Sequence, residues 1–223
     1  YLYRIDGKFY LFNDFKNNGD EPFLNALAQT DVIPKTSQPS VGETLEMYDH
    51  IKSLGYTNII YLPIAKELSG TYQNAHLAKN SHEGIQIDIV DTQTTVSILG
   101  KMALVAAQMA KDGHSVNEII DAVMAIKSKW GFFFGVSDLT SLVKNGRLSN
   151  AKSFVANILK IKPLLEFSQD GYLRAKKNIR TFKKTLIAIV DAVIPHVESD
   201  ETEIHILSTN NVADREFTVA LLK

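Results

Sequence analysis

The spacing of apolar and polar residues changes near the middle of the chain, and the change predicts two kinds of sheet. Two short runs in the first half, residues 57–64 and 85–90, are almost continuously apolar, which is typical of strands buried on both faces. A segment with helical spacing separates them, so we expect a βαβ unit with parallel strands. Beyond about residue 130 the strand-like stretches are more amphipathic, which favours antiparallel pairing.

Helical spacing and helix-end signals place several helices around these strands. Ser40 and Glu43 form a capping-box pattern before a segment that closes at Gly55. A long segment that is apolar on most sides ends at Gly113, and we expect that helix to be central and buried. The next helix should begin near Ser115. Further helices are expected over residues 21–29, 154–160 and 183–197.

Turn signals and alternating residues predict the remaining strands. Asp6-Gly7 and Asp170-Gly171 each lie between two strand-like stretches and indicate β-hairpins. The stretch EIHILSTN, residues 203–210, is also expected to be a strand. We therefore predict an α/β protein of two domains. Residues 1–130 should form a Rossmann-like domain with a parallel sheet, and residues 131–223 a mixed α/β domain.

Composition excludes several classes of function. The 223 residues include 24 Lys and Arg against 25 Asp and Glu, so the net charge of -1 gives no electrostatic reason to expect binding to nucleic acid or to an anionic membrane. No apolar run is long enough to be a membrane-spanning helix. Cysteine is absent, which excludes disulfide and thiol chemistry and fits a reducing cytoplasm.

Hydroxyl-bearing residues occur at three places that should be turns after strands or before helices: Thr36-Ser37, Ser69-Gly70-Thr71 and residues 91–95. Such turns gather at the carboxyl edge of a parallel sheet, where ligands usually bind. Each alone is equally explained as a helix cap or a local turn. Gly70 favours a site, because a residue without Cβ lets backbone N–H groups approach a ligand closely. Hydroxyls, N–H groups and a helix dipole together suit a negatively charged group.

Two arginines and the histidines are the other candidates for chemistry. The guanidinium of Arg147 could hold a carboxylate or phosphate, although Asn145-Gly146 beside it is also an ordinary turn pair. Arg180 lies in a basic run that is equally explained as a solvated face. The six histidines lack the spacing of a zinc site, so we expect no metal. The motifs GxxxxGK[ST], GxGxxG and GxSxG are absent as well, which leaves no nucleotide or hydrolase-elbow motif.

The chain is richer in apolar residues than two surface layers require, most clearly over residues 98–107, 132–136 and 154–165. These segments are explained simply as core. The alternative is that some of their side chains line a tunnel for an apolar ligand tail.

Six stretches, taken together and in order, resemble the DegV family: TSQPS, LSGTYQNA, IVDTQTTVS, LVKNGRLS, LKIKPLLEFSQDG and KNIRTFKK. The match runs from about residue 20 to residue 185. The resemblance implies a bacterial protein of two α/β domains that binds one long-chain fatty acid between them. It also implies a carrier rather than an enzyme, the fatty-acid-binding subunit of fatty acid kinase, which presents the carboxylate to a separate ATP-dependent kinase that makes acyl-phosphate.

The resemblance also implies site residues. Hydroxyls of the TSQPS and LSGT stretches would hold the carboxylate, which carries over to Thr36, Ser37, Ser69, Gly70 and Thr71. Arg147 and Arg180 would belong to the surface that meets the kinase or the transferred phosphate.

The chain also departs from the family pattern. The family's opening Asp-Ser-Thr strand is absent, its ISS stretch reads Ile64-Ala65-Lys66, and its GGR reads Asn145-Gly146-Arg147. His205 lies about two residues out of register with a family histidine that helps to bind the carboxylate.

Two other classes of function remain open at this point. The chain could be a small-molecule hydrolase or transferase that uses Ser69 with His205, although no third member of a triad is placed. It could also be a regulatory protein that binds lipid without any phosphoryl transfer. Fatty acid that co-purifies with the protein favours a lipid-binding role, and a response to a kinase separates the carrier from the regulator.

Overall fold

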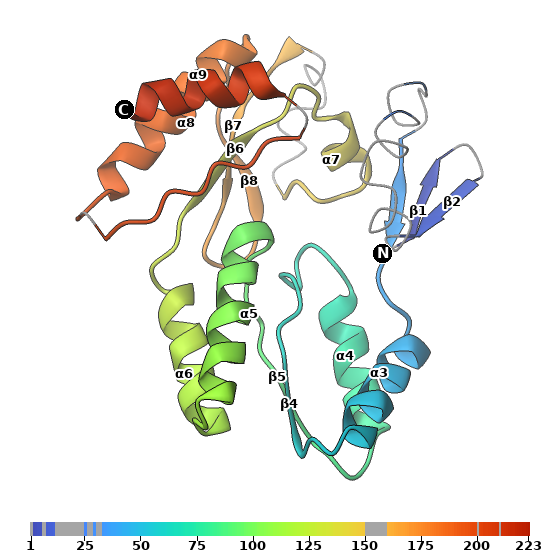
Figure 1. The fold of residues 1–223 in the computed structure, drawn as a ribbon. Helices are drawn as coiled ribbons and strands as arrows, with labels where there is room; N and C mark the ends of the chain where they lie inside the picture. The colour runs from blue at the N-terminus through green and yellow to red at the C-terminus, as the bar shows by residue number, and fades with distance from the viewer. Residues whose placement is uncertain are drawn as a thin grey trace.

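The computed structural model describes residues 2–5, 8–11, 25, 29, 33–149, 160–199, 201–209 and 211–223, and Figure 1 shows their arrangement. The strands are β1 (Leu2–Ile5), β2 (Lys8–Leu11), β3 (Lys35–Ser37), β4 (Asn58–Tyr61), β5 (Gln86–Ile89), β6 (Phe132–Gly135), β7 (Leu164–Phe167) and β8 (Leu173–Lys177). The helices are α3 (Val41–Ser53), α4 (Thr71–Asn80), α5 (Val96–Lys111), α6 (Val116–Lys127), α7 (Thr140–Lys144), α8 (Phe182–Val193), η3 (Ile194–His196) and α9 (Val212–Leu222).

Strand β1 is the middle strand of an antiparallel sheet with β2 and β3 at its sides. Ile5 pairs with Lys8 across β1 and β2, and Thr36 pairs with Tyr3 across β3 and β1. Residues 6 and 7 lie outside the described residues, but the antiparallel pairing on either side of them confirms the predicted hairpin.

Strands β4 and β5 form a parallel pair with α4 between them in the chain, as the apolar runs predicted. Ile59 of β4 lies in register with Ile87 of β5, and both are buried. They share a hydrophobic core with Tyr48 of α3 and Ala78 of α4, whose apolar faces cover the pair.

Helices α3 and α6 begin as the capping signals predicted. Ser40 Oγ accepts the Glu43 N–H at 3.1 Å, and the Glu43 carboxylate accepts the Ser40 N–H at 2.8 Å. Ser115 and Glu118 form the same reciprocal pair at the start of α6. These bonds satisfy backbone donors that a helix start otherwise leaves without partners.

Helix α5 is buried on one side only, so the expectation of a helix buried on most sides was wrong. Met102 and Ala106 belong to the main core and α6 packs alongside, whereas Leu104 is 72% exposed. Four of the eleven apolar residues of this helix are alanines. Burying such small residues stabilises a helix little, so their number is a weak signal for burial.

Strands β6, β7 and β8 form an antiparallel sheet, which confirms the mixed α/β character of the second half. The β7–β8 hairpin turns at Asp170-Gly171 as predicted, with Gly171 at a φ of +88°. Helix α8 packs on β6 so closely that a Cβ on Gly135 would lie 2.7 Å from Thr185 Cγ2. Figure 1 shows α9 lying across α8.

The predicted strand at residues 203–210 was wrong, because residues 201–209 contain no strand. An alternating pattern forms a strand only where a sheet edge is available to pair with it. Here the segment is held instead by an ion pair between Glu203 and Lys101 of α5, 2.7 Å apart. Ile204 and Leu207 are both exposed.

One hydrophobic cluster joins the two halves of the chain. It includes Met102 and Val123 from α5 and α6, Leu165 and Phe167 from β7, and Trp130 between them. In Figure 1, α3 to α6 with β4 and β5 lie below, and β6 to β8 with α8 and α9 lie above. The division into domains at residue 130 stays a prediction.

Some expectations fall outside the described residues, namely nearly all of the helices at 21–29 and 154–160. Within the described part of the chain, no helix is long and apolar enough to cross a membrane. The same residues include no group of three or more His, Cys, Asp or Glu side chains that could hold a metal ion.

Candidate functional site

The turn between β4 and α4 brings two predicted hydroxyls together. Ser69 Oγ lies 2.8 Å from Thr71 Oγ1 and also accepts the Thr71 N–H at 3.3 Å. Thr71 is only 5% exposed, and Ser69 is half-buried. The N-cap of α4 is Gly70, which offers no side-chain cap. The start of α4 is therefore a compact pair of hydroxyls with further backbone N–H groups near it.

The TSQPS stretch lies directly against this turn. Asn74 Nδ2 on α4 donates to the Pro39 carbonyl at 2.7 Å. A Cβ built on Gly70 would lie 2.6 Å from Gln38 Nε2, so the Gln38 side chain occupies the space that Gly70 leaves open. Both contacts join segments more than thirty residues apart.

Thr36 and Ser37 lie in strand β3, not in a turn as expected. Pairing with β1 draws them into a short strand, and the turn begins only at Gln38. Both residues are exposed. They immediately precede Gln38, which contacts Gly70, so they lie beside the same helix start.

Arg147 reaches the same turn from the segment that follows α7. Its Nε donates to the Leu68 carbonyl at 3.3 Å, and its Nη1 donates to the Asn145 carbonyl at 2.5 Å. Asn145 Nδ2 in turn donates to the Pro34 carbonyl at 3.2 Å. Both acceptors of Arg147 are neutral, and none of the ion pairs among the described residues includes this arginine. Within the described part of the chain, the guanidinium of Arg147 thus has no ion-pair partner beside the Ser69 turn.

The third hydroxyl segment, residues 91–95, meets the β4–α4 loop from the neighbouring strand. The Ala65 N–H donates to the Thr94 carbonyl at 2.9 Å. Thr92 Oγ1 donates to the Pro63 carbonyl at 2.7 Å. These two bonds fix the two loops side by side at the carboxyl end of the parallel pair, which is where open parallel sheets bind ligands.

Charged side chains flank these loops. Lys66 Nζ lies 3.4 Å from the Asp91 carboxylate, and the hydrogen bond that Lys66 donates to it raises the pKa of Lys66. Lys127 Nζ donates to the Asp91 backbone carbonyl at 3.1 Å, and burial lowers the pKa of Lys127. Glu67, which follows Lys66 in the β4–α4 loop and helps to raise its pKa, is a second negative side chain here, so Lys66 and Lys127 are balanced by Asp91 and Glu67.

Arg180 lies at a different place from the hydroxyl turns. It lines a hollow of about 420 Å³ at the start of α8, together with Lys177 and Lys184. The hydrogen bonds that join the TSQPS, LSGT and NGR segments do not extend to it within the described part of the chain.

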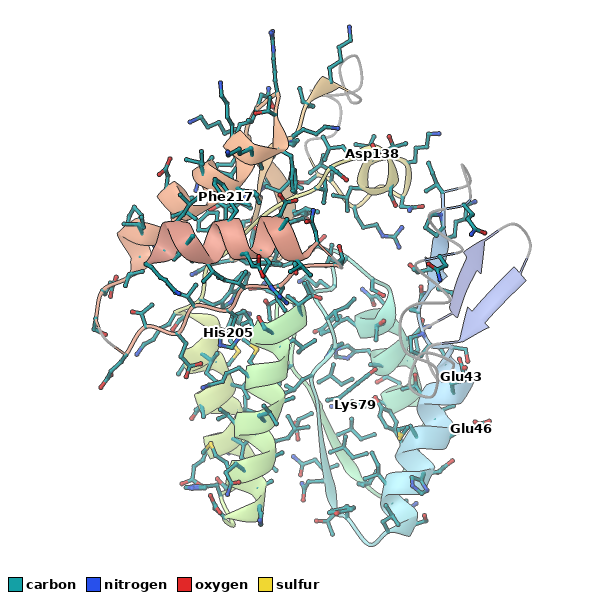
Figure 2. All side chains as sticks on the ribbon, turned by 45° about the horizontal axis from the view of Figure 1, so that its top comes forward. Glu43, Glu46, Lys79, Asp138, His205 and Phe217 are labelled. Atoms are coloured by element: carbon teal, nitrogen blue, oxygen red, sulfur yellow. The ribbon has the colours of Figure 1, made fainter. Side chains whose placement is uncertain are left out.

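His205 also lies apart from the proposed carboxylate residues. Its Nε2 is 3.2 Å from Glu203, whose carboxylate is held by Lys101 of α5, and Figure 2 labels it on the segment before α9. Ser69 is hydrogen-bonded to Thr71 instead. Among the described residues, the structure therefore does not form the Ser69–His205 pair that the hydrolase alternative needs.

Three residues that the sequence reasoning did not single out connect the site: Gln38, Asn74 and Asn145. Each lies inside one of the stretches that resemble the DegV family, and that membership was the only signal available. Their partners are backbone carbonyls or a glycine far away in the chain, so no local pattern could predict the contacts.

Fold and site together define an α/β protein in which hydroxyl-bearing loops, a helix start and Arg147 meet at the carboxyl edge of the parallel pair. The family model described as "Uncharacterised protein, DegV family" matches residues 4–223. The chain belongs to the DegV family. A DegV domain-containing protein of Staphylococcus aureus is 30% identical over 210 residues, which cover 91% of this chain and 73% of that protein.

Solved structures agree with this assignment. The fatty acid binding DegV family protein from Streptococcus agalactiae is 29% identical, with a TM-score of 0.84 over 99% of this chain and 77% of that one. The fatty acid kinase (Fak) B3 protein of Streptococcus pneumoniae, loaded with linoleic acid, is 24% identical with a TM-score of 0.70, covering 87% and 68% of the two chains. At that identity the second likeness bears on the fold alone.

Proposed function

We propose that this chain is a fatty-acid-binding carrier protein. It holds a long-chain fatty acid by its tail in an apolar tunnel and presents the carboxylate to a separate ATP-dependent kinase, which forms acyl-phosphate. The observation that carries the proposal is the convergence of the PKTSQPS, LSGTYQN and NGR segments through the hydrogen bonds of Asn74, Asn145 and Arg147. The binding of fatty acid by the Streptococcus agalactiae relative supports it.

The head group needs donors, because an isolated carboxylate in a dry cleft costs several kcal/mol. We assign this role to Thr36, Ser37, Ser69 and Thr71, together with backbone N–H groups at Gly70, which a ligand reaches only if the Gln38 side chain moves aside. Ser69 and Thr71 are bonded to one another in the structure, so a carboxylate oxygen would take the place of that mutual bond. The positive charge of Arg147 beside them supports an anion at this position.

The tail supplies most of the affinity. At about 0.8 kcal/mol for each buried CH₂, a chain of roughly 15 methylenes offers on the order of 12 kcal/mol before the costs of association and ordering. We place the tail between the two halves of the chain. Partly buried apolar residues on both sides of the polar mouth, Leu68 and Leu142 among them, already pack against the core that the halves share.

The kinase partner follows from the family resemblance and from the lack of a nucleotide motif in the chain. Arg147 and Arg180 are then the residues proposed to meet the kinase or the transferred phosphate. We place this reaction in the bacterial cytoplasm, where ATP is available. No observation in the structure favours the hydrolase alternative.

Lipid extraction tests the binding role directly. Protein purified without added lipid is denatured and analysed by mass spectrometry, and one equivalent of a long-chain fatty acid is expected for each chain. Protein that carries no fatty acid and takes up none from oleate would refute the proposal. Esterase turnover by such empty protein would instead support the hydrolase.

The kinase role is tested separately with oleate-loaded protein and the fatty acid kinase of the same organism. Arg147→Ala and Arg180→Ala are each expected to slow acyl-phosphate formation while the amount of bound oleate stays the same. Lys111→Ala, at the exposed end of α5, is the matched control for loss of a surface charge. If both arginine variants support the wild-type rate, their role at the kinase surface is lost.

A further inference from the structure

Two buried threonines, Thr92 and Thr94, lie two residues apart in the loop between β5 and α5 and differ in one respect. Both are fully buried. Thr92 Oγ1 donates to the Pro63 carbonyl at 2.7 Å. Thr94 Oγ1 has no hydrogen-bond partner among the residues that the structure describes.

An unpaired buried hydroxyl is unfavourable and uncommon. Most buried side-chain polar atoms in proteins have a hydrogen-bond partner. A group without one pays the desolvation penalty and gains no hydrogen bond. Valine has the same shape as threonine and would fill the position of Thr94 without that penalty. Thr94 Oγ1 is one of four such unpaired atoms among the described residues, with His76 Nε2, His82 Nδ1 and Trp130 Nε1, so its surroundings decide whether it could serve a ligand.

The position of Thr94 indicates which ligand this could be. Its backbone carbonyl accepts the Ala65 N–H, and Ala65 lies in the loop that leads from β4 to Ser69. A Cβ on Gly171 would lie 3.5 Å from the Gln93 side chain and 3.6 Å from the Ala65 Cβ, so the β7–β8 turn closes over the same point. Thr94 thus lies where loops from both halves of the chain meet.

The backbone around Thr94 is strained. Gln93 and Val96 have φ values of 51° and 47°, in the left-handed region that non-glycine residues rarely adopt. For Val96 the strain is larger, because its side chain is β-branched. Such strain persists where the surrounding structure holds a segment in a functional conformation.

The helix that follows is open at its start. The N-cap of α5 is Thr95, whose side chain makes no capping bond, and the N-cap of α4 on the neighbouring strand is Gly70. The two helices therefore begin at the same edge of the β4–β5 pair without an N-cap side-chain bond, although the Thr71 N–H is accepted by Ser69 Oγ, and free N–H groups at a helix start favour an anion.

We propose that Thr94 is a further binding residue for the fatty-acid carboxylate and that its Oγ1 donates a hydrogen bond to a carboxylate oxygen. The proposal rests on the fatty-acid-binding function proposed above. It extends the head-group site from the β4–α4 turn, where Ser69 and Thr71 lie, to the β5–α5 loop. The chemistry is that of a hydroxyl and a charged acceptor, which form a strong hydrogen bond in a dry site.

The test compares Thr94→Val with Thr92→Val, a matched variant in the same loop. Each protein is stripped of lipid and titrated with oleate and with oleyl alcohol, which has the same tail but no carboxylate. The fluorescence of Trp130, the single tryptophan, reports binding, because this residue lies in the core cluster that also contains Ala65. The melting temperature of each lipid-free protein is measured alongside.

The two variants are expected to differ in the melting temperature of the lipid-free protein and in how strongly they discriminate between oleate and oleyl alcohol. Thr94→Val should weaken oleate binding by about tenfold or more, should change oleyl alcohol binding much less, and should leave the lipid-free melting temperature equal or higher. Thr94→Ser, which keeps the hydroxyl, should bind oleate as wild type does. Thr92→Val should lower the lipid-free melting temperature, because it leaves the Pro63 carbonyl unpaired and loosens the two loops, and should weaken the binding of oleate and of oleyl alcohol to a similar degree.

Other outcomes overturn the inference. If Thr94→Val binds oleate as tightly as wild type, or loses oleate and oleyl alcohol equally, Thr94 does not contact the carboxylate. If lipid-free Thr94→Val is less stable than Thr92→Val, the hydroxyl has a structural role instead. If wild-type protein itself does not bind oleate, the proposed function fails, and the inference fails with it.

Discussion

The four helices α3 to α6 begin in two different ways, and among these four the difference follows their place in the fold. Helices α3 and α6 each begin with a complete capping box, Ser40 with Glu43 and Ser115 with Glu118. Helices α4 and α5, which follow the parallel strands, begin at Gly70 and Thr95 with no side-chain cap. A capped start satisfies its own N–H groups, whereas an open start leaves them available to a ligand.

The comparison shows that a local sequence motif can identify a helix start that serves stability alone. A Ser-x-x-Glu pattern identifies a helix start that is complete in itself. Ser69 and Thr71 belong to no such pattern, and their hydroxyls bond to one another instead of forming a capping box. We infer that hydroxyls at the first kind of start stabilise the fold and that those at the second kind serve binding.

The largest expected effect concerns the open start of α4. In the double variant Ser69→Ala/Thr71→Val, acyl-phosphate formation with the matching kinase should fall by about 100-fold, because the carboxylate is no longer held in one orientation. The lipid content measured by mass spectrometry should change little, since the tail provides most of the affinity. Ser115→Ala serves as the control and should leave both quantities as in wild type. Equal loss of lipid and of rate would show that the hydroxyls retain the lipid and do not orient it.

The next largest effect concerns backbone strain at the first residue of α5, tested against the first residue of α6. Val96→Gly should raise the free energy of unfolding of lipid-free protein by about 1 kcal/mol, because glycine accepts a φ of 47° without strain. Val116→Gly, at the first position of the capped helix α6, should lower it by about 0.5 kcal/mol, since glycine is the poorer helix former. Urea denaturation of both variants measures these two changes in the free energy of unfolding. Destabilisation of similar size in both would mean that the start of α5 is not strained.

A smaller effect is expected at the capped starts. Ser115→Ala should lower the free energy of unfolding by about 1 kcal/mol, because the Glu118 N–H loses its acceptor. Oleate affinity should stay at its wild-type value, as calorimetric titration can show. A change in affinity would mean that capped starts are coupled to the ligand site, which would break the distinction between the two kinds of helix start.

The smallest effect is a dependence on pH at the same cap. Hydrogen bonds from Ser115 hold the pKa of Glu118 below its ordinary value of 4.5. A carboxyl whose pKa is lowered by folding adds stability that is fully present above pH 4.5 and is lost as the pH falls through the lowered value. The stability difference between wild type and Glu118→Gln should therefore shrink on acidification. A difference that stays constant from pH 7 to pH 3 would contradict this account of the cap.

The sequence predicted those parts of the fold that depend on local signals. The capping boxes, the parallel pair and the Asp170-Gly171 hairpin each follow from a few adjacent residues. The strand at residues 203–210 failed because strand formation needs a partner edge, which no local pattern reports. Thr36 and Ser37 were placed in a turn for the same reason, since their pairing with β1 is a distant contact.

The candidate site was predictable in its residue types and not in its contacts. The family resemblance indicated Arg147, but its bond to the Leu68 carbonyl spans 79 residues. The hydroxyl-rich segment that contains Thr92 and Thr94 was visible in the sequence, yet only the fold shows that one hydroxyl is paired and the other is not. Only the fold shows that Arg147 and Arg180 lie in different places, Arg147 beside the Ser69 turn and Arg180 in the hollow at the start of α8.

The most direct test of the central claim is a crystal structure of the protein loaded with oleate. The account predicts that the carboxylate lies within hydrogen-bonding distance of Ser69 and Thr71 Oγ atoms, between the starts of α4 and α5, with the tail running into the core that joins the two halves. A carboxylate bound elsewhere, for example in the hollow beside Arg180, would contradict it.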